Sequence, residues 1–246
     1  MTRIVAHRGF AGVNPENTVG AVRAAADAGA AMVELDVVAC ADGTPVVFHD
    51  AHLGSAGGSR GITDGSGAVA DLSPDAVTAA EVLDGGERVP TLDRLLDETD
   101  VPLNVELKRP VAAPDPRGAL PAADRDAARE RWQPLVDRTL DCLDGRDVLL
   151  SSFYEGALAA VRRRDGTAPL APICTELGTG RILAARYDAE TIHPSLSAVR
   201  NVDPAPTDRT VNVWTTRTWH EAREAIRAGA DGLIADYPGL TRWFES

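Results

Sequence analysis

The chain has 246 residues and a formal net charge of −12, with a pI of about 4.8. This acidic balance argues against a nucleic-acid backbone as the main partner, and it is unfavourable for contact with anionic membrane surfaces. No apolar run approaches the roughly 18 residues that span a bilayer, so we expect no stable membrane insertion. A binding site for an anionic substrate would have to supply its own positive charge.

The N-terminal residues and the cysteines favour a cytoplasmic protein. Residues 1–7 contain no apolar segment of the kind that a secretory signal requires. Cys40, Cys142 and Cys174 are far apart and form no metal-binding spacing, which is typical of reduced thiols.

Strands and helices alternate along the chain. Apolar and β-branched runs predict strands over residues 4–6, 31–38, 102–108, 147–152, 169–174, 190–193, 211–215 and 232–236. Apolar residues at helical spacing predict helices over about 17–28, 74–83, 92–98, 122–143, 155–164, 179–186, 196–202, 220–228 and 239–244. Pro134 should kink or divide the long helix that contains it.

Two features interrupt this alternation after the second strand. Asp42-Gly43 predicts a tight hairpin turn, which leads into a short extension over residues 45–49. Residues 51–75 then hold six glycines among serine, threonine and aspartate. That composition predicts a loop-rich insertion.

Eight strand–helix units in 246 residues match the usual size of a (β/α)₈ TIM barrel. We expect a single domain over residues 1–246, with the small Gly-rich insertion after the second strand, over about 51–75. An open doubly wound sheet is the alternative. No Gly-x-Gly-x-x-Gly follows a strand, so nothing favours a dinucleotide site.

The second strand carries two carboxylates, Glu34 and Asp36. Successive side chains on a strand point to opposite faces, so these two share one face, roughly 7 Å apart along the strand. Buried together, they would repel each other unless a positive charge lay between them, and hard divalent cations prefer carboxylate oxygens. The alternative is a pair of solvated acids on an edge strand.

Other polar residues also fall at the predicted ends of strands, where active sites lie in α/β barrels. They include three histidines, two further carboxylates and the single lysine of the chain. The full set is His7, Arg8, His49, Glu106, Lys108, Ser152, His193, Trp214 and Asp236. A cluster of titratable groups indicates a functional site, although structural ion-pair networks also contain such clusters. His193 could line the pocket or make a structural hydrogen bond.

The order and spacing of these residues resemble the glycerophosphodiester phosphodiesterase family. The resemblance is carried by five motifs, His7-Arg8-Gly9, Pro15-Glu16-Asn17-Thr18, Glu34-Leu35-Asp36, the segment from Asp42-Gly43 to His49-Asp50, and Glu106-Leu107-Lys108. The C-terminal half adds Trp214-Thr215 and an Ala-Gly-Ala-Asp-Gly-Leu-Ile run. Because it spans essentially the whole chain, this resemblance implies a TIM barrel that hydrolyses glycerophosphodiesters to glycerol phosphate and an alcohol.

The resemblance also implies a role for each matching residue. Glu34, Asp36 and Glu106 would bind one divalent cation, Mg²⁺ or Ca²⁺. His7 and His49 would act in acid–base catalysis. Arg8, Lys108 and Trp214 would bind the substrate, the first two at the phosphate and the third at the pocket wall.

Two other functions remain open at this stage. The first is a lysophospholipase D-type enzyme with a lipid leaving group, which would need an apolar entrance that the Gly-rich insertion does not show. The second is a non-catalytic barrel that binds phosphate esters. The insertion departs from the usual Arg-Thr-Thr-like stretch and reads Arg60-Gly61-Ile62-Thr63, after a longer Gly/Ser segment. This departure bears on the identity of the leaving alcohol.

Overall fold

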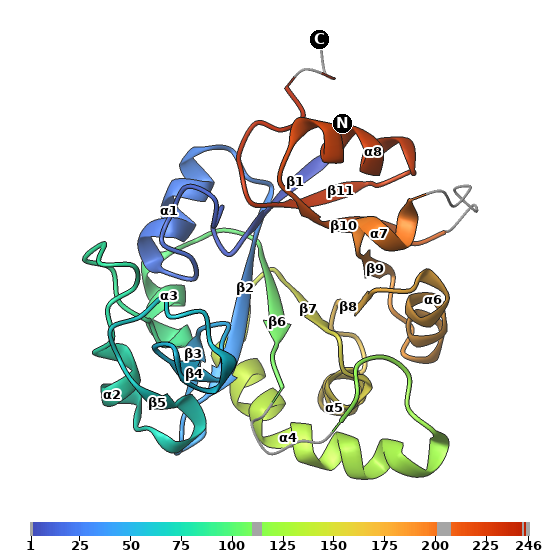
Figure 1. The fold of residues 1–246 in the computed structure, drawn as a ribbon. Helices are drawn as coiled ribbons and strands as arrows, with labels where there is room; N and C mark the ends of the chain where they lie inside the picture. The colour runs from blue at the N-terminus through green and yellow to red at the C-terminus, as the bar shows by residue number, and fades with distance from the viewer. Residues whose placement is uncertain (1, 110–114, 201–207, 243, 245–246) are drawn as a thin grey trace.

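A computed structural model describes residues 2–109, 115–200, 208–242 and 244. Eight parallel strands form a closed barrel, with helices around the outside of the ring (Figure 1). The strands are β1 (Arg3–His7), β2 (Met32–Ala39), β6 (Leu103–Leu107), β7 (Val148–Ser152), β8 (Leu170–Cys174), β9 (Thr191–Pro194), β10 (Thr210–Thr216) and β11 (Gly232–Ala235). The predicted TIM barrel is therefore confirmed.

The ring closes between the first and last of these strands. β1 pairs in parallel with β11, Arg3 opposite Gly232, and on its other side with β2, His7 opposite Glu34. No sheet edge is left within the ring, so each buried backbone donor and acceptor can find a partner strand.

The predicted hairpin is also present. β3 (Pro45–Val47) pairs antiparallel with the distal half of β2, and Gly43 adopts a left-handed φ of 87° in the turn. The extension that follows β3 therefore begins at the carboxyl end of β2, which is where His49 lies.

The Gly-rich insertion folds against this hairpin (Figure 1). It contains β4 (His52–Leu53), the 3₁₀ turns η1 (Ala56–Gly58) and η2 (Val69–Asp71), and β5 (Gly67–Ala68), which pairs antiparallel with β4. A small apolar core, separate from the main one, joins Val46 and Phe48 to Leu53, Val69 and Val77. This core fixes the insertion to the barrel, beside the carboxyl ends of β2 and β6.

The helices are α1 (Val19–Asp27), α2 (Pro74–Thr78), α3 (Leu92–Glu98), α4 (Arg125–Cys142), α5 (Glu155–Arg164), α6 (Leu177–Arg186), α7 (Leu196–Val199) and α8 (Trp219–Arg227), with a 3₁₀ turn, η3 (Ala122–Asp124), before α4. Capping side chains explain where several of these helices begin. Thr18, Ser73, Thr91, Ser195 and Thr218 each accept a backbone N–H from the first turn. No described helix is both long and apolar enough to cross a membrane.

Four predicted helices differ from the observed ones. α2 ends at Thr78, because the residues after it form isolated bridges, Thr63 with Val82 and Glu81 with Arg88. α4 runs past Pro134 undivided. The helix expected over 239–244 is wrong, since residues 238–242 form turns. The helix expected over 196–202 ends at Val199, and residues 201–202 lie outside the described residues.

Candidate active site

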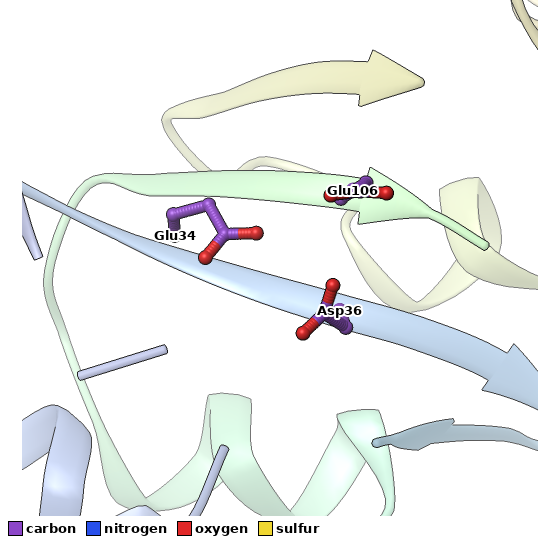
Figure 2. A group of neighbouring side chains, drawn as sticks. All are labelled: Glu34, Asp36 and Glu106. Atoms are coloured by element: carbon purple, nitrogen blue, oxygen red, sulfur yellow. The ribbon is translucent and has the colours of Figure 1, made fainter. Parts of the chain in front are cut away.

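Three carboxylates meet at the carboxyl ends of adjacent strands. Glu34 and Asp36 lie on β2, Glu106 lies opposite Asp36 on β6, and one oxygen from each lies within 4.8 Å of the others (Figure 2). All three are buried, which contradicts the alternative of solvated acids on an edge strand. We call this group the acidic cluster.

The residues of the acidic cluster fit a hard cation. Burial and the charges of Asp36 and Glu106 raise the pKa of Glu34 well above its usual range. Burial alone would also raise the pKa of Asp36, but the charges of Arg8 and Lys108 outweigh it and hold that pKa well below its usual range. Asp36 Oδ1 is buried and accepts no hydrogen bond among the described residues, so it keeps lone pairs for a metal ion.

Two basic side chains contact the acidic cluster. Lys108 Nζ lies 2.9 Å from Glu106 Oε1 and 3.3 Å from Asp36 Oδ1. Arg8 Nε lies 2.9 Å from Asp36 Oδ2, in an ion pair without hydrogen-bond geometry, and the Arg8 backbone N–H donates to Glu34 at 3.0 Å. Both side chains are mostly buried, so they neutralise the carboxylates at short range.

His7 ends β1 and is oriented by a carboxylate from the far end of the chain. His7 Nδ1 lies 2.5 Å from Asp236 Oδ1, and His7 Nε2 lies 4.0 Å from Glu34 Oε2. The second Asp236 oxygen accepts from Arg217 Nε at 2.8 Å. The Nε2 edge of the His7 imidazole therefore faces the acidic cluster.

His49 is oriented in the same way by its neighbour in sequence. His49 Nδ1 lies 2.6 Å from Asp50 Oδ1, and burial lowers the pKa of His49 below its ordinary value. Arg60, from the insertion, donates through Nε to Asp50 at 3.1 Å and through both terminal nitrogens to Glu16, at 2.8 and 2.7 Å. Glu16 also pairs with Arg8 at 3.0 Å. Arg60 therefore connects Asp50, which orients His49, to Glu16, which pairs with Arg8.

The Pro-Glu-Asn-Thr segment positions the cluster through Asn17. Asn17 donates to Asp36 Oδ2 at 2.9 Å and accepts from the Asp36 backbone N–H at 3.2 Å. It does so from a left-handed φ of 60°, a conformation that asparagine tolerates better than most residues. Thr18 then caps α1 through its hydroxyl, which accepts from Ala21 N at 3.1 Å.

A cavity of about 210 Å³ opens over these groups, and we call it the inner cavity. All the predicted site residues line it except Asp36, namely His7, Arg8, Glu34, His49, Glu106, Lys108 and Trp214. Trp214 packs edge-to-face on Phe153, with the ring centroids 5.3 Å apart. His193 also lines the cavity; it is buried, its Nε2 lies 3.1 Å from Asn212 Nδ2, and burial lowers its pKa to about 3.

Sequence reasoning did not assign a role to several residues that contact the site. Asp50, Glu16 and Asn17 belong to the quoted motifs, so their positions could have been found from those motifs. Arg60, Arg117 and Arg217 carry no local signal, because their contacts depend on how distant loops pack.

The comparisons with known proteins agree with the fold. The model of the glycerophosphoryl diester phosphodiesterase family matches residues 7–240. The uncharacterised protein YqiK of Bacillus subtilis is 30% identical, over 97% of this chain and 96% of its own length. A glycerophosphodiester phosphodiesterase of Caldanaerobacter subterraneus is 26% identical, over 96% of this chain and 95% of its own.

Solved structures show the same architecture. An Oleispira antarctica phosphodiesterase, in complex with the product sn-glycerol-3-phosphate, aligns with a TM-score of 0.81 at 23% identity, covering 99% of this chain and 97% of its own. A glycerophosphodiester phosphodiesterase of Thermotoga maritima aligns with a TM-score of 0.69 at 19% identity, covering 100% of this chain and 98% of its own.

Proposed function

Because this chain belongs to the glycerophosphoryl diester phosphodiesterase family, whose members hydrolyse glycerophosphodiesters, we propose that it performs this reaction with one divalent cation and two histidines. The products are glycerol phosphate and an alcohol. The observation that carries the proposal is the inner cavity, where two oriented imidazoles, two basic side chains and two carboxylates of the acidic cluster face one space.

Hydrolysis of a phosphodiester has three requirements. The monoanion must be neutralised, a nucleophile must lose a proton, and the departing alkoxide must gain one. When bound by the acidic cluster, Mg²⁺ or Ca²⁺ would supply part of the neutralisation, as a Lewis acid at a phosphoryl oxygen. The Arg8 and Lys108 side chains, which line the same cavity, supply the remainder through charge-assisted hydrogen bonds.

The two histidines supply the proton transfers. In each, Nδ1 is engaged by an aspartate, Asp236 for His7 and Asp50 for His49, which fixes the ring and leaves Nε2 free for a proton. One imidazole can therefore accept a proton from the nucleophile while the other donates one to the alkoxide. Trp214 provides an apolar wall beside them, because its Nε1 is held by the His193 carbonyl at 2.8 Å.

The test is a hydrolysis assay with the purified protein, followed by phosphorus NMR. Glycerophosphocholine, glycerophosphoethanolamine, glycerophosphoglycerol and a lysophospholipid are supplied in turn with Mg²⁺, with Ca²⁺ and with excess chelator. We expect glycerol phosphate to be released from at least one glycerophosphodiester, and we expect chelation to stop the reaction. Preference for the lysophospholipid would favour the lipid enzyme instead.

Histidine variants test the acid–base assignment. His7→Ala and His49→Ala should each lower kcat by about 10²-fold or more, the scale of a lost general acid or base. His220→Ala is the matched control, because His220 is an exposed residue on α8 and does not line the cavity. Turnover near that of the control in either variant would remove that histidine from the mechanism.

A further inference from the structure

A second cavity adjoins the inner one beneath the Gly-rich insertion. Its volume is about 340 Å³, and we call it the outer cavity. It shares His49, Glu106, Lys108, Arg117 and Phe153 with the inner cavity, so the two spaces meet beside the acidic cluster. Its own lining includes Gly57, Gly58 and Ser59 of the insertion and Arg109 after β6.

The two adjoining cavities match the two halves of a glycerophosphodiester. The inner cavity, about 210 Å³, has fixed walls of barrel strands, and it suits the constant glycerol phosphate half. The outer cavity is bordered by loops, which vary more readily than strands. The leaving alcohol, which differs between substrates, therefore belongs in the outer cavity. This assignment rests on the proposed function.

The charge of the outer cavity is positive. Its two acidic lining residues are already engaged, Asp50 by His49 and Arg60 and Glu106 by Lys108. Among the described residues, neither Arg109 nor Arg117 has a carboxylate partner. In a chain of net charge −12, unpaired arginines beside a pocket are free to receive an anionic ligand.

Arg117 is held in a geometry that suits an anion. Its guanidinium lies 4.4 Å from the centroid of the Phe153 ring. The adjacent Gly118 N–H donates to the Phe153 carbonyl at 2.8 Å, which ties the same loop to the same residue. A guanidinium over an aromatic ring can still offer N–H groups for bidentate hydrogen bonds to a phosphate or carboxylate.

The same contact disfavours a cationic head group. A quaternary ammonium binds best over an open aromatic face. In the outer cavity, Arg117 covers Phe153, and Tyr154 packs against Trp132 with the ring centroids 5.3 Å apart. A choline head group would meet like charge where it needs a π-face.

We propose that the outer cavity is the leaving-alcohol subsite and that it selects an alcohol bearing a second anionic group, a phosphate or carboxylate bound by Arg117. The discriminating pair of substrates is glycerophosphoinositol and glycerophosphoinositol 4-phosphate, which differ by one phosphate. The wild-type protein with Mg²⁺ at low salt should show a kcat/KM about tenfold or more higher for the phosphorylated substrate, the scale of hydrogen bonds to a charged group. Glycerophosphocholine should be the poorest substrate of the three.

Arg117→Gln should reduce the ratio of the two kcat/KM values to near unity, and Arg117→Lys should give an intermediate ratio, because lysine keeps the charge without the planar fork. Arg94→Gln is the control; Arg94 is exposed on α3, pairs with Glu98, and should leave the ratio unchanged. Equal kcat/KM values in the wild type, a ratio preserved in Arg117→Gln, or fastest turnover of glycerophosphocholine would each overturn the proposal.

Calorimetric titration with free inositol 4-phosphate separates this proposal from the proposed function. If no glycerophosphodiester is hydrolysed, the proposed function fails. Binding of inositol 4-phosphate that is lost in Arg117→Gln and kept in Arg94→Gln would still support the subsite. Equal binding, or none, in all three proteins would reject it.

Discussion

His7 and Asp236 lie 229 residues apart in the chain, yet His7 Nδ1 is 2.5 Å from Asp236 Oδ1. β1 pairs with β11, His7 is the last residue of β1, and Asp236 directly follows β11. The carboxylate fixes the ring orientation and the tautomer of His7, so the proton-transfer edge of the imidazole faces the inner cavity. Asp236 is therefore a positioning residue for the proposed chemistry.

Asp236→Asn should lower kcat by about 10²-fold while changing KM little, because the amide can hold the histidine in the wrong tautomer. The pH profile of kcat should also change shape on the limb that reports His7. The control is Asp126→Asn, whose exposed side chain pairs with Arg129 on α4. Unchanged kcat in Asp236→Asn would mean that the contact serves stability alone.

Metal binding to the acidic cluster should release protons. Because burial and two neighbouring carboxylates raise the pKa of Glu34, a proton competes with a cation for this group. Titration of the metal-free protein with Mg²⁺ or Ca²⁺, in buffers of different ionisation enthalpy, should show release of up to about one proton and tighter binding as the pH rises. Glu34→Gln should bind more weakly and release fewer protons. Equal proton release in both proteins would place the proton elsewhere.

Lys108→Met separates two roles for the single lysine. Its ammonium contacts Asp36 and Glu106 directly, so a purely structural ion pair remains compatible with the geometry. If Lys108 binds the phosphate, its loss should cost about 2–5 kcal/mol of transition-state stabilisation, measured from kcat/KM. The melting temperature of the metal-loaded protein should change little. Normal turnover with a much lower melting temperature would identify a structural lysine.

His193 should make stability depend on pH below neutrality. Burial lowers its pKa from 6.5 to about 3, so between these values the unfolded chain binds a proton that the folded chain does not. The contribution of His193 is thus complete above about pH 6.5 and is lost as the pH falls towards 3.

Relative to His193→Gln, the wild type should lose about 2–3 kcal/mol of unfolding free energy between pH 6.5 and 4.5. Urea unfolding of both proteins in chelator measures this difference, because the carboxylates shared by the two chains cancel. If the unfolding free energies of the two proteins change in parallel with pH, this prediction is contradicted.

The sequence predicted the parts of this site that depend on strand periodicity. Alternation alone places Glu34 with Asp36 and Glu106 with Lys108, and the hairpin turn at Asp42-Gly43 carries His49 back to the same end. What it could not predict was the register between neighbouring strands, and therefore that Asp36 stands opposite Glu106. The register of a barrel is decided by closure of the whole ring and not by local residues.

The missed contacts have the same origin. Arg60 lies among glycines whose backbone freedom hides the path of the loop, and its carboxylate partners are 10 and 44 residues away. The helix predicted over 239–244 failed because Gly239, at a φ of 70°, favours a turn where the apolar spacing favoured a helix.

Closure of the barrel through β1 and β11 also has a kinetic consequence. The central strand–helix units rest on contacts close in sequence and can form early, whereas joining Arg3 to Gly232 closes the longest loop in the ring. Until that step, His7 lacks its carboxylate partner, whereas the acidic cluster needs only the pairing of β2 with β6. During refolding, the protein should therefore regain cation binding before it regains turnover.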